Sequence, residues 1–185
     1  GLICKIIGAV YRIPLTNIIG EEAMGIYSKV YQIYTLLLVL STSGLPTAIS
    51  KLVAERYAMN DPRGAESIFK LARNILLTFG GICMSLMMLF SGLIADSLGI
   101  SEGAFVVICI APSLILSVMS SYYGYFQGMQ LMLPSATSQV VGQVGKLLFG
   151  FTFAILWMPK GPTMAAAGAL LGVTLSEFGS LVYIY

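Results

Sequence analysis

Residues 103–145 read GAFVVICIAPSLILSVMSSYYGYFQGMQLMLPSATSQVVGQVG and contain no charged side chain. A membrane-crossing helix needs about 20 predominantly apolar residues, so this run is too long for one helix. The polar segment QGMQLMLP at residues 127–134 ends in a proline and interrupts it. The run therefore predicts two antiparallel transmembrane helices, over about 102–126 and about 135–157.

The composition of the whole chain agrees with a membrane protein. Of its 185 residues, 57% are hydrophobic and 10% charged, with a mean hydropathy of +0.89, whereas soluble domains have about 45–50% apolar and about 25% charged residues. This excludes a soluble globular fold. The net charge of +2 is too small and scattered for a nucleic-acid surface, so no nucleic acid is expected as a partner.

Residue types that carry catalysis and metal binding are scarce. The chain has no histidine, and its three cysteines are far apart and embedded in apolar runs. No phosphate loop or nucleophile triad is found. We therefore expect no catalytic residue, no metal site and no cofactor, and we do not expect an enzyme.

Further apolar segments predict helices over about 1–20, 26–50, 70–95 and 163–185. The predicted fold class is an all-α, polytopic membrane protein with about six transmembrane helices. The charged segment at about 51–69 and its flanks carry five basic residues, against one or two in the loops of the opposite face, which places this loop and the N-terminus in the cytoplasm. The five are Lys51, Arg56, Arg63, Lys70 and Arg73. Asp61 followed by Pro62 predicts a helix N-cap. Because the chain begins with Gly1, we expect a fragment of a longer protein.

Ionisable side chains inside the predicted spans are candidate site residues, since burying them in a bilayer is costly. Lys5 and Arg12 lie seven residues apart on one face of the first span. For Lys5, snorkelling to the interface is an equal alternative. Polar residues also form a stripe on the fifth span, and the sixth span carries one acid; these candidates are Gln139, Gln143, Lys146 and Glu177.

Lys146 and Glu177 come to similar depths if the last two helices are antiparallel neighbours. We hypothesise an ion pair between them, which either fixes the bundle or breaks during a transport cycle. Two groups of aromatic residues fit interfacial belts, with sugar stacking as the alternative: one is Tyr27, Tyr31 and Tyr34, and the other is Tyr122, Tyr123, Tyr125 and Phe126. Glycines at 142, 145 and 150 would allow helices to approach closely.

Three strings carry a family resemblance: KIIGAVYRIPLTNIIGEEAMGIYSKVYQIYTLLL at 5–38, STSGLPTAISKLVAE at 41–55 and YYGYFQGMQLMLPSATSQVVGQVGK at 122–146. They resemble the polysaccharide-biosynthesis branch of the MATE-like (MOP) exporter superfamily, especially its stage V sporulation protein B type. This branch also includes the lipid II flippases of the MurJ type. The resemblance implies a V-shaped transporter of two six-helix lobes, of which this chain is most of the N-terminal lobe and the C-terminal lobe is absent.

The resemblance also implies alternating access across the bacterial cytoplasmic membrane, with an undecaprenyl-pyrophosphate-linked saccharide as cargo. In the lipid II flippases, basic residues of the first helix line the cavity, and Lys5 and Arg12 occupy that stretch with a different spacing. We expect a multi-pass flippase of an oligosaccharide or peptidoglycan precursor, with the lipid bilayer and the lipid-linked saccharide as partners. Whether a coupling ion takes part in the transport is left open. The alternatives are a MATE-like cation-coupled multidrug exporter, which the lack of an acid before Glu21 disfavours, and a non-transporting scaffold for cell-wall synthesis.

Overall fold

Helices make up the part of the chain that the computed structural model describes, which is residues 2–42, 44–100 and 103–185. The side chains of residues 2–9 and of residue 41 lie outside this description. No strand occurs in the described ranges. The elements in chain order are α1 (Leu2–Thr42), α2 (Leu45–Ala58), α3 (Pro62–Leu89), α4 (Ser91–Ser97), α5 (Ala104–Ile110), the 3-10 helix η1 (Ala111–Val118), α6 (Met119–Gly128), α7 (Leu133–Trp157), the 3-10 turn η2 (Met158–Lys160) and α8 (Pro162–Ile184).

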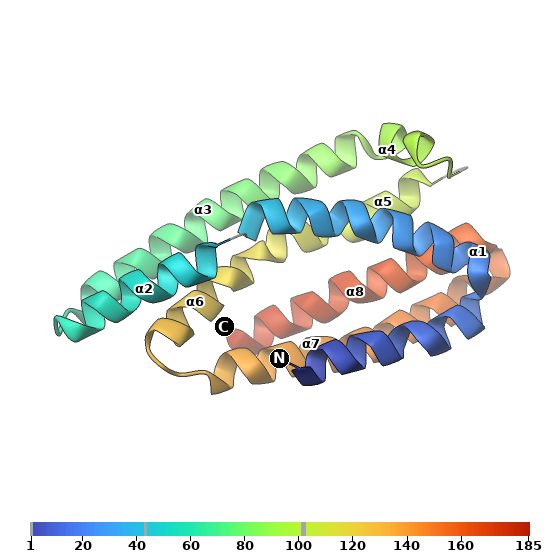
Figure 1. Ribbon diagram of the computed structural model, residues 1–185. Coiled ribbons are helices and arrows are strands. Elements are labelled where there is room, and N and C mark those ends of the chain that lie inside the picture. The colour runs from blue at the N-terminus through green and yellow to red at the C-terminus, as the bar shows by residue number, and fades with distance from the viewer. Residues whose placement is uncertain (1, 43, 101–102) are drawn as a thin grey trace.

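Helix α1 is divided by a sharp turn at Gly20. The backbone there has φ 82° and ψ 166°, a conformation that glycine adopts at low cost because it has no Cβ. Figure 1 shows that the chain reverses at this point, so that the first arm (residues 2–19) and the second arm (residues 21–42) run in opposite directions. The first arm packs on α7, where the Tyr11 ring centroid lies 5.2 Å from that of Phe151.

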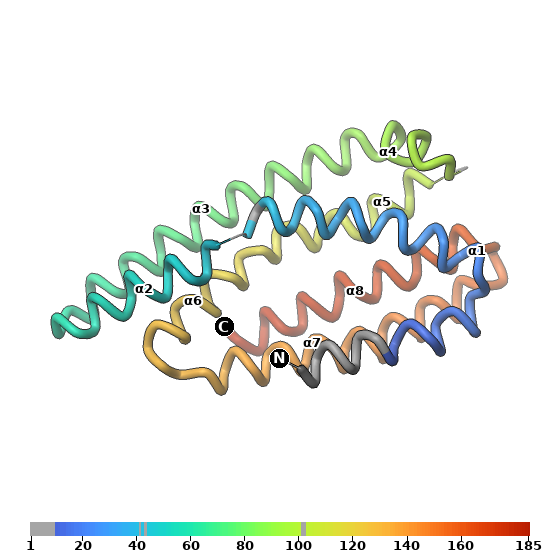
Figure 2. Tube along the Cα trace, viewed as in Figure 1, coloured from blue at the N-terminus to red at the C-terminus, as the bar shows by residue number. Residues whose placement is uncertain are grey.

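Long antiparallel helices follow. Gly44, with φ 74°, precedes α2, and the reversal into α3 begins at Asp61, whose side chain accepts a hydrogen bond of 2.9 Å from the Gly64 amide. Pro62 stands at the first helical position, so the predicted N-cap is confirmed. Figure 2 shows the trace then passing through α5, η1 and α6 as one continuous rod before it turns into α7.

Five helical stretches of the described residues are apolar and long enough to cross a membrane. They are Val10–Ala58, Pro62–Leu89, Ala104–Gly128, Leu133–Lys160 and Pro162–Ile184. The first has 49 residues and contains the turn at Gly20. The all-α fold class predicted from the sequence is confirmed, whereas the bounds of the six predicted spans and the cytoplasmic side of residues 51–69 stay predictions.

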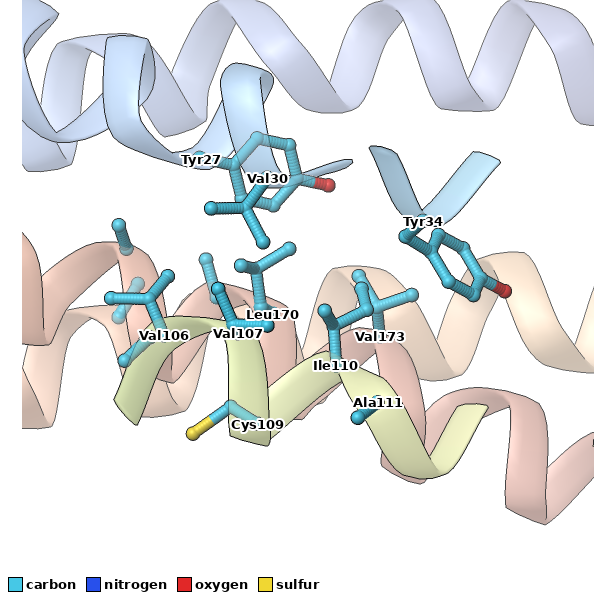
Figure 3. Packing of buried hydrophobic residues seen from close by; sticks show 14 of the residues in the cluster. Tyr27, Val30, Tyr34, Val106, Val107, Cys109, Ile110, Ala111, Leu170 and Val173 are labelled. Atoms are coloured by element: carbon cyan, nitrogen blue, oxygen red, sulfur yellow. The ribbon is translucent and has the colours of Figure 1, made fainter. Parts of the chain in front are cut away.

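The core lies where the second arm of α1, the α5–η1 rod and α8 meet. In Figure 3 the side chains of Tyr27, Val30 and Tyr34 from α1 face aliphatic residues of the other two elements, which include Val106, Val107 and Ile110 of α5 and Leu170 and Val173 of α8. These residues are between 0 and 2% exposed. The position of the second arm is therefore fixed by close packing on two partners.

Helices α7 and α8 approach each other along small residues. A Cβ added to Gly145 would lie 3.1 Å from the Ser176 Cβ, and one added to Gly172 would collide with the backbone of Gly150. Ser138 and Ser180 exchange reciprocal hydrogen bonds, from each hydroxyl to the other backbone carbonyl, at 3.1 and 3.0 Å. Small residues and such bonds are what hold transmembrane helices together, because lipid provides no hydrophobic driving force between helices.

Gly172→Ala tests this packing. We expect it to lower the free energy of unfolding by about 1–3 kcal/mol, because overpacking a tight interface forces the backbone to shift. Gly179→Ala in the same helix is the matched control, since a Cβ there meets no atom within 4 Å. Thermal unfolding of the purified variants in one detergent, followed by circular dichroism, measures the difference. Equal melting temperatures would contradict the close approach of α7 and α8.

Candidate functional site

Four of the predicted site residues line one cavity, which we call the polar cavity. It has a volume of about 330 Å³ and lies among the second arm of α1, η1, α6, α7 and α8. Its polar lining consists of Tyr31, Thr42, Ser117, Ser120, Tyr123, Gln139, Gln143, Lys146, Ser176, Glu177 and Ser180. Gly142 contributes backbone, and the remainder of the lining is apolar.

The α7 wall carries the predicted polar stripe. Gln139, Gln143 and Lys146 are all half-buried, and they face the same cavity because residues four and seven apart lie on one face of a helix. The Lys146 Nζ lies 3.3 Å from the Tyr31 hydroxyl, to which it donates a hydrogen bond. It also lies 4.9 Å from the Tyr31 ring centroid and 5.8 Å from that of Tyr11, which is cation–π distance.

The α8 wall carries Glu177, which is half-buried. Its carboxylate accepts a hydrogen bond from the hydroxyl of Tyr34, at 3.1 Å to Oε1 and 3.0 Å to Oε2. Tyr34 is 1% exposed, so a rigid donor from α1 holds the carboxylate. A hydrogen bond to a charged acceptor is stronger than one between neutral groups.

The hypothesised Lys146–Glu177 ion pair is not formed in this structure. Within the described ranges, ion pairs of 4.0 Å or less join Arg56 to Asp61 and Lys70 to Glu66 only. Lys146 and Glu177 are instead each bound by a tyrosine of α1. The sequence placed the two charges at similar depth but could not show that another helix supplies a separate partner to each.

The structure corrects the interpretation of the first aromatic group, Tyr27, Tyr31 and Tyr34, as an interfacial belt. Tyr27 and Tyr34 are buried at 2% and 1% exposure, and Tyr31 lines the polar cavity. The Tyr27 and Tyr31 rings are stacked at 5.5 Å. The spacing of three and four residues was the available signal, because it puts all three tyrosines on one helical face along the bundle instead of gathering them at one end.

The second aromatic group, at residues 122–126, is also partly buried and partly at the polar cavity. Tyr122 is 8% exposed and belongs to a buried cluster, and Tyr123 lines the polar cavity. Tyr125 and Phe126 are half-buried, with ring centroids 5.9 Å apart. These residues therefore contribute to helix packing and to the cavity lining, and not only to an aromatic belt at one end of the bundle.

Arg12 lies apart from the polar cavity. It is exposed and borders a second, wider hollow of about 530 Å³ between the two arms of α1, together with Gln32 and Thr35. Tyr31 lines both hollows. The side chain of Lys5 lies outside the described residues. Tyr31 is thus the residue that the hollow at Arg12 and the polar cavity have in common.

The polar cavity offers one ammonium, one carboxylate, two amides and several hydroxyls in a low-dielectric surrounding. Such a set can compensate a buried anion and donate hydrogen bonds to a polar headgroup. In the described part of the chain, no three His, Cys, Asp or Glu side chains gather as metal ligands. The charged, amide and hydroxyl groups of the polar cavity are suited to binding a polar group.

Comparison with known proteins places these features in a family. The model of the family described as polysaccharide biosynthesis protein matches residues 1–185. Stage V sporulation protein B of Bacillus subtilis (strain 168) is 33% identical over 187 residues, which cover 100% of this chain and 36% of that protein. Lipid II flippase MurJ of the same strain is 32% identical over 196 residues, covering 99% of this chain and 36% of that protein.

A solved structure shares the fold. It is described as the crystal structure of MATE in complex with MaD3S, and it superposes with a TM-score of 0.82 at 16% identity, over 98% of this chain and 40% of that one. At this identity the likeness concerns the fold alone. The chain spans about a third of the length of the curated relatives it matches, at 36% of each of the two above.

Tyr34→Phe tests the contact that holds Glu177. We expect the variant to lose about 1–2 kcal/mol of stability, because a half-buried carboxylate loses its donor. Tyr27→Phe is the matched control: it removes a hydroxyl from the same buried face, and Tyr27 makes no hydrogen bond to another described residue through that group. Melting temperatures in a single detergent provide the measurement. A loss for Tyr27→Phe as large as for Tyr34→Phe would disprove the specific role of the Tyr34 hydroxyl.

Proposed function

The chain belongs to the polysaccharide biosynthesis protein family, and from this premise we propose that the complete protein is a flippase. Its cargo is an undecaprenyl-pyrophosphate-linked oligosaccharide or peptidoglycan precursor, and it moves this cargo across the bacterial cytoplasmic membrane by alternating access. The similarity to a lipid II flippase over 99% of this chain supports the proposal. In this proposal the chain forms most of the N-terminal lobe, with its N-terminus in the cytoplasm.

The observation that carries the proposal is the Lys146 ammonium in the polar cavity. Lys146 lies about midway along α7, at a depth where an uncompensated charge is expensive and therefore marks a pathway. It has no carboxylate within 4.0 Å among the described residues, so its charge is available to a diphosphate. The amides of Gln139 and Gln143 on the same wall can bond to sugar hydroxyls.

The size of the polar cavity suits part of such a cargo. A volume of about 330 Å³ is at the lower end of the range of about 300–1,000 Å³ for ligand pockets. It can hold a diphosphate with a sugar, while a longer saccharide and the polyprenyl tail extend beyond it. The wider hollow at Arg12 supplies a second cation for the same passage.

A MATE-like cation-coupled exporter is the second candidate. Two observations favour it, namely the fold shared with a MATE transporter and the Glu177 carboxylate in the polar cavity. A carboxylate there can bind a cationic drug or a coupling ion. Against it stands Lys146, because an ammonium in the same cavity repels a cation. In either case the activity is transport without covalent change of the cargo.

Complementation tests the flippase directly. The full-length gene is expressed in a strain depleted of its lipid II flippase, and growth and outer-leaflet precursor are followed. We expect the wild type to restore both, and Lys146→Gln and Arg12→Ala to lower precursor transport about tenfold or more at equal protein levels, since a charged hydrogen bond to the cargo is lost.

Lys160→Gln is the control, because this exposed lysine lies in the η2 turn outside the polar cavity. Failure of the membrane-inserted wild type to restore growth, together with efflux of a cationic dye that requires Glu177, would replace the flippase with the drug exporter. Full rescue by Lys146→Gln would remove the role proposed for Lys146. Rescue by every variant, together with failure of the wild type to move any cargo in vesicles, would instead indicate a scaffold for cell-wall synthesis.

A further inference from the structure

A separate groove runs along the outside of the bundle, and we call it the α3–α8 groove. It has a volume of about 350 Å³, and its walls come from α3, η1, α6 and α8. Its lining consists of Arg73, Leu77, Val118, Tyr122, Phe178, Leu181, Val182 and Tyr185. Phe178 and Val182 are 56% and 63% exposed, so the groove opens away from the core. None of its residues lines the polar cavity.

Arg73 is the one charged residue of this lining, and its polar atoms are poorly satisfied. The Nε is buried and has no hydrogen-bond partner among the described residues. The guanidinium lies over the Phe69 ring, at 5.8 Å to its centroid. The neighbouring Lys70 behaves differently, since it pairs with Glu66 at 2.8 Å. A buried donor on a charged group is costly when it is unpaired, so an anionic acceptor that reaches this nitrogen would be bound favourably.

Aromatic rings lie around Arg73, and its position along α3 indicates its depth in the membrane. Phe69 lies 4.9 Å from the Tyr122 ring, and Tyr122 lies 6.5 Å from the Tyr185 ring. Together they surround the end of the groove that holds Arg73. The depth of Arg73 follows from the charge pattern, because residues 51–73 carry eight charged side chains whereas residues 74–95 carry none, so that the apolar span begins next to Arg73. In a bilayer, this pattern would put the guanidinium near the headgroups and the apolar walls that follow it beside the acyl chains.

From this juxtaposition we propose that the α3–α8 groove binds an anionic glycerophospholipid, with its phosphate on the Arg73 guanidinium and an acyl chain along Leu77, Phe178 and Val182. The planar fork of arginine matches two phosphate oxygens. Basic pockets between transmembrane helices bind such lipids. Apart from Arg73 and the hydroxyls of Tyr122 and Tyr185, the lining is apolar, and this single cation above a long apolar wall matches one phosphate with its hydrocarbon chain, which favours a lipid over a protein partner. The site is independent of the cargo pathway and holds whether or not the protein is a flippase.

Lipid binding to the full-length, delipidated protein tests the proposal by native mass spectrometry. The two probes are phosphatidylglycerol and the diacylglycerol with the same acyl chains, which lacks the phosphate. We expect the wild type to bind phosphatidylglycerol about tenfold or more tightly than diacylglycerol, as a charge-assisted bond to phosphate would give. Arg73→Gln should lose this preference while it retains the affinity for diacylglycerol, which also shows that the variant is folded.

Two further variants separate the headgroup site from the groove. Arg63→Gln is the matched control, because Arg63 is an exposed basic residue of α3 outside the groove lining and should leave the preference unchanged. Leu77→Trp fills the groove and should weaken the binding of both lipids about equally.

Several results would overturn the proposal. Equal binding of both lipids by the wild type would show that no phosphate site exists, and binding of neither would show that another part of the protein covers the groove. A phosphatidylglycerol preference that survives Arg73→Gln would place the phosphate elsewhere. Unchanged binding by Leu77→Trp would exclude the acyl chain from the groove, and this variant decides the matter should Arg73→Gln fail to fold.

Discussion

The close approach of α7 and α8 is the constraint on which the polar cavity depends. Glycine and serine on both helices let the backbones meet, and the Ser138–Ser180 bonds fix one helix against the other. Because the two helices are antiparallel and rise about 1.5 Å per residue, this register alone sets the depths of Lys146 and Glu177. A bulky residue at the contact would displace both walls of the cavity together.

The second arm of α1 completes the polar cavity by keeping the two charges apart. Tyr31 and Tyr34 bind Lys146 and Glu177 separately, so the two charges share the cavity without a direct ion pair. In a low-dielectric cavity a direct ion pair would be strong and would have to be broken by any charged ligand. A tyrosine hydroxyl makes a weaker contact that a phosphate or a cation can replace. The arm that carries these hydroxyls is itself held by the core shown in Figure 3, so the cavity is preorganised.

The sequence predicts well how deep a residue lies along its helix. It predicts poorly which face of the helix is turned toward the bundle. Helical rise and uncharged length placed Lys146 and Glu177 near each other, and the i, i+4, i+7 pattern put Gln139, Gln143 and Lys146 on one wall, where the structure has them. The turn direction at Gly20 was not predictable, because hydropathy does not show which face of each arm meets the bundle. For that reason the sequence assigns Tyr34 to a belt although it is buried, and groups Arg12 with the polar cavity although it lines a different hollow.

The surroundings of Lys146 and Arg73 decide which part of a lipid each can bind. Lys146 lies at mid-depth among amides and hydroxyls, where a phosphate with an attached sugar finds partners on every side and an acyl chain finds few. Arg73 stands beside a largely apolar lining, where the same phosphate must carry hydrocarbon along the walls. A polyprenyl-linked saccharide and a glycerophospholipid share the phosphate but differ in what flanks it. Discrimination between them therefore rests on the neutral residues of each site, because both cations attract either lipid.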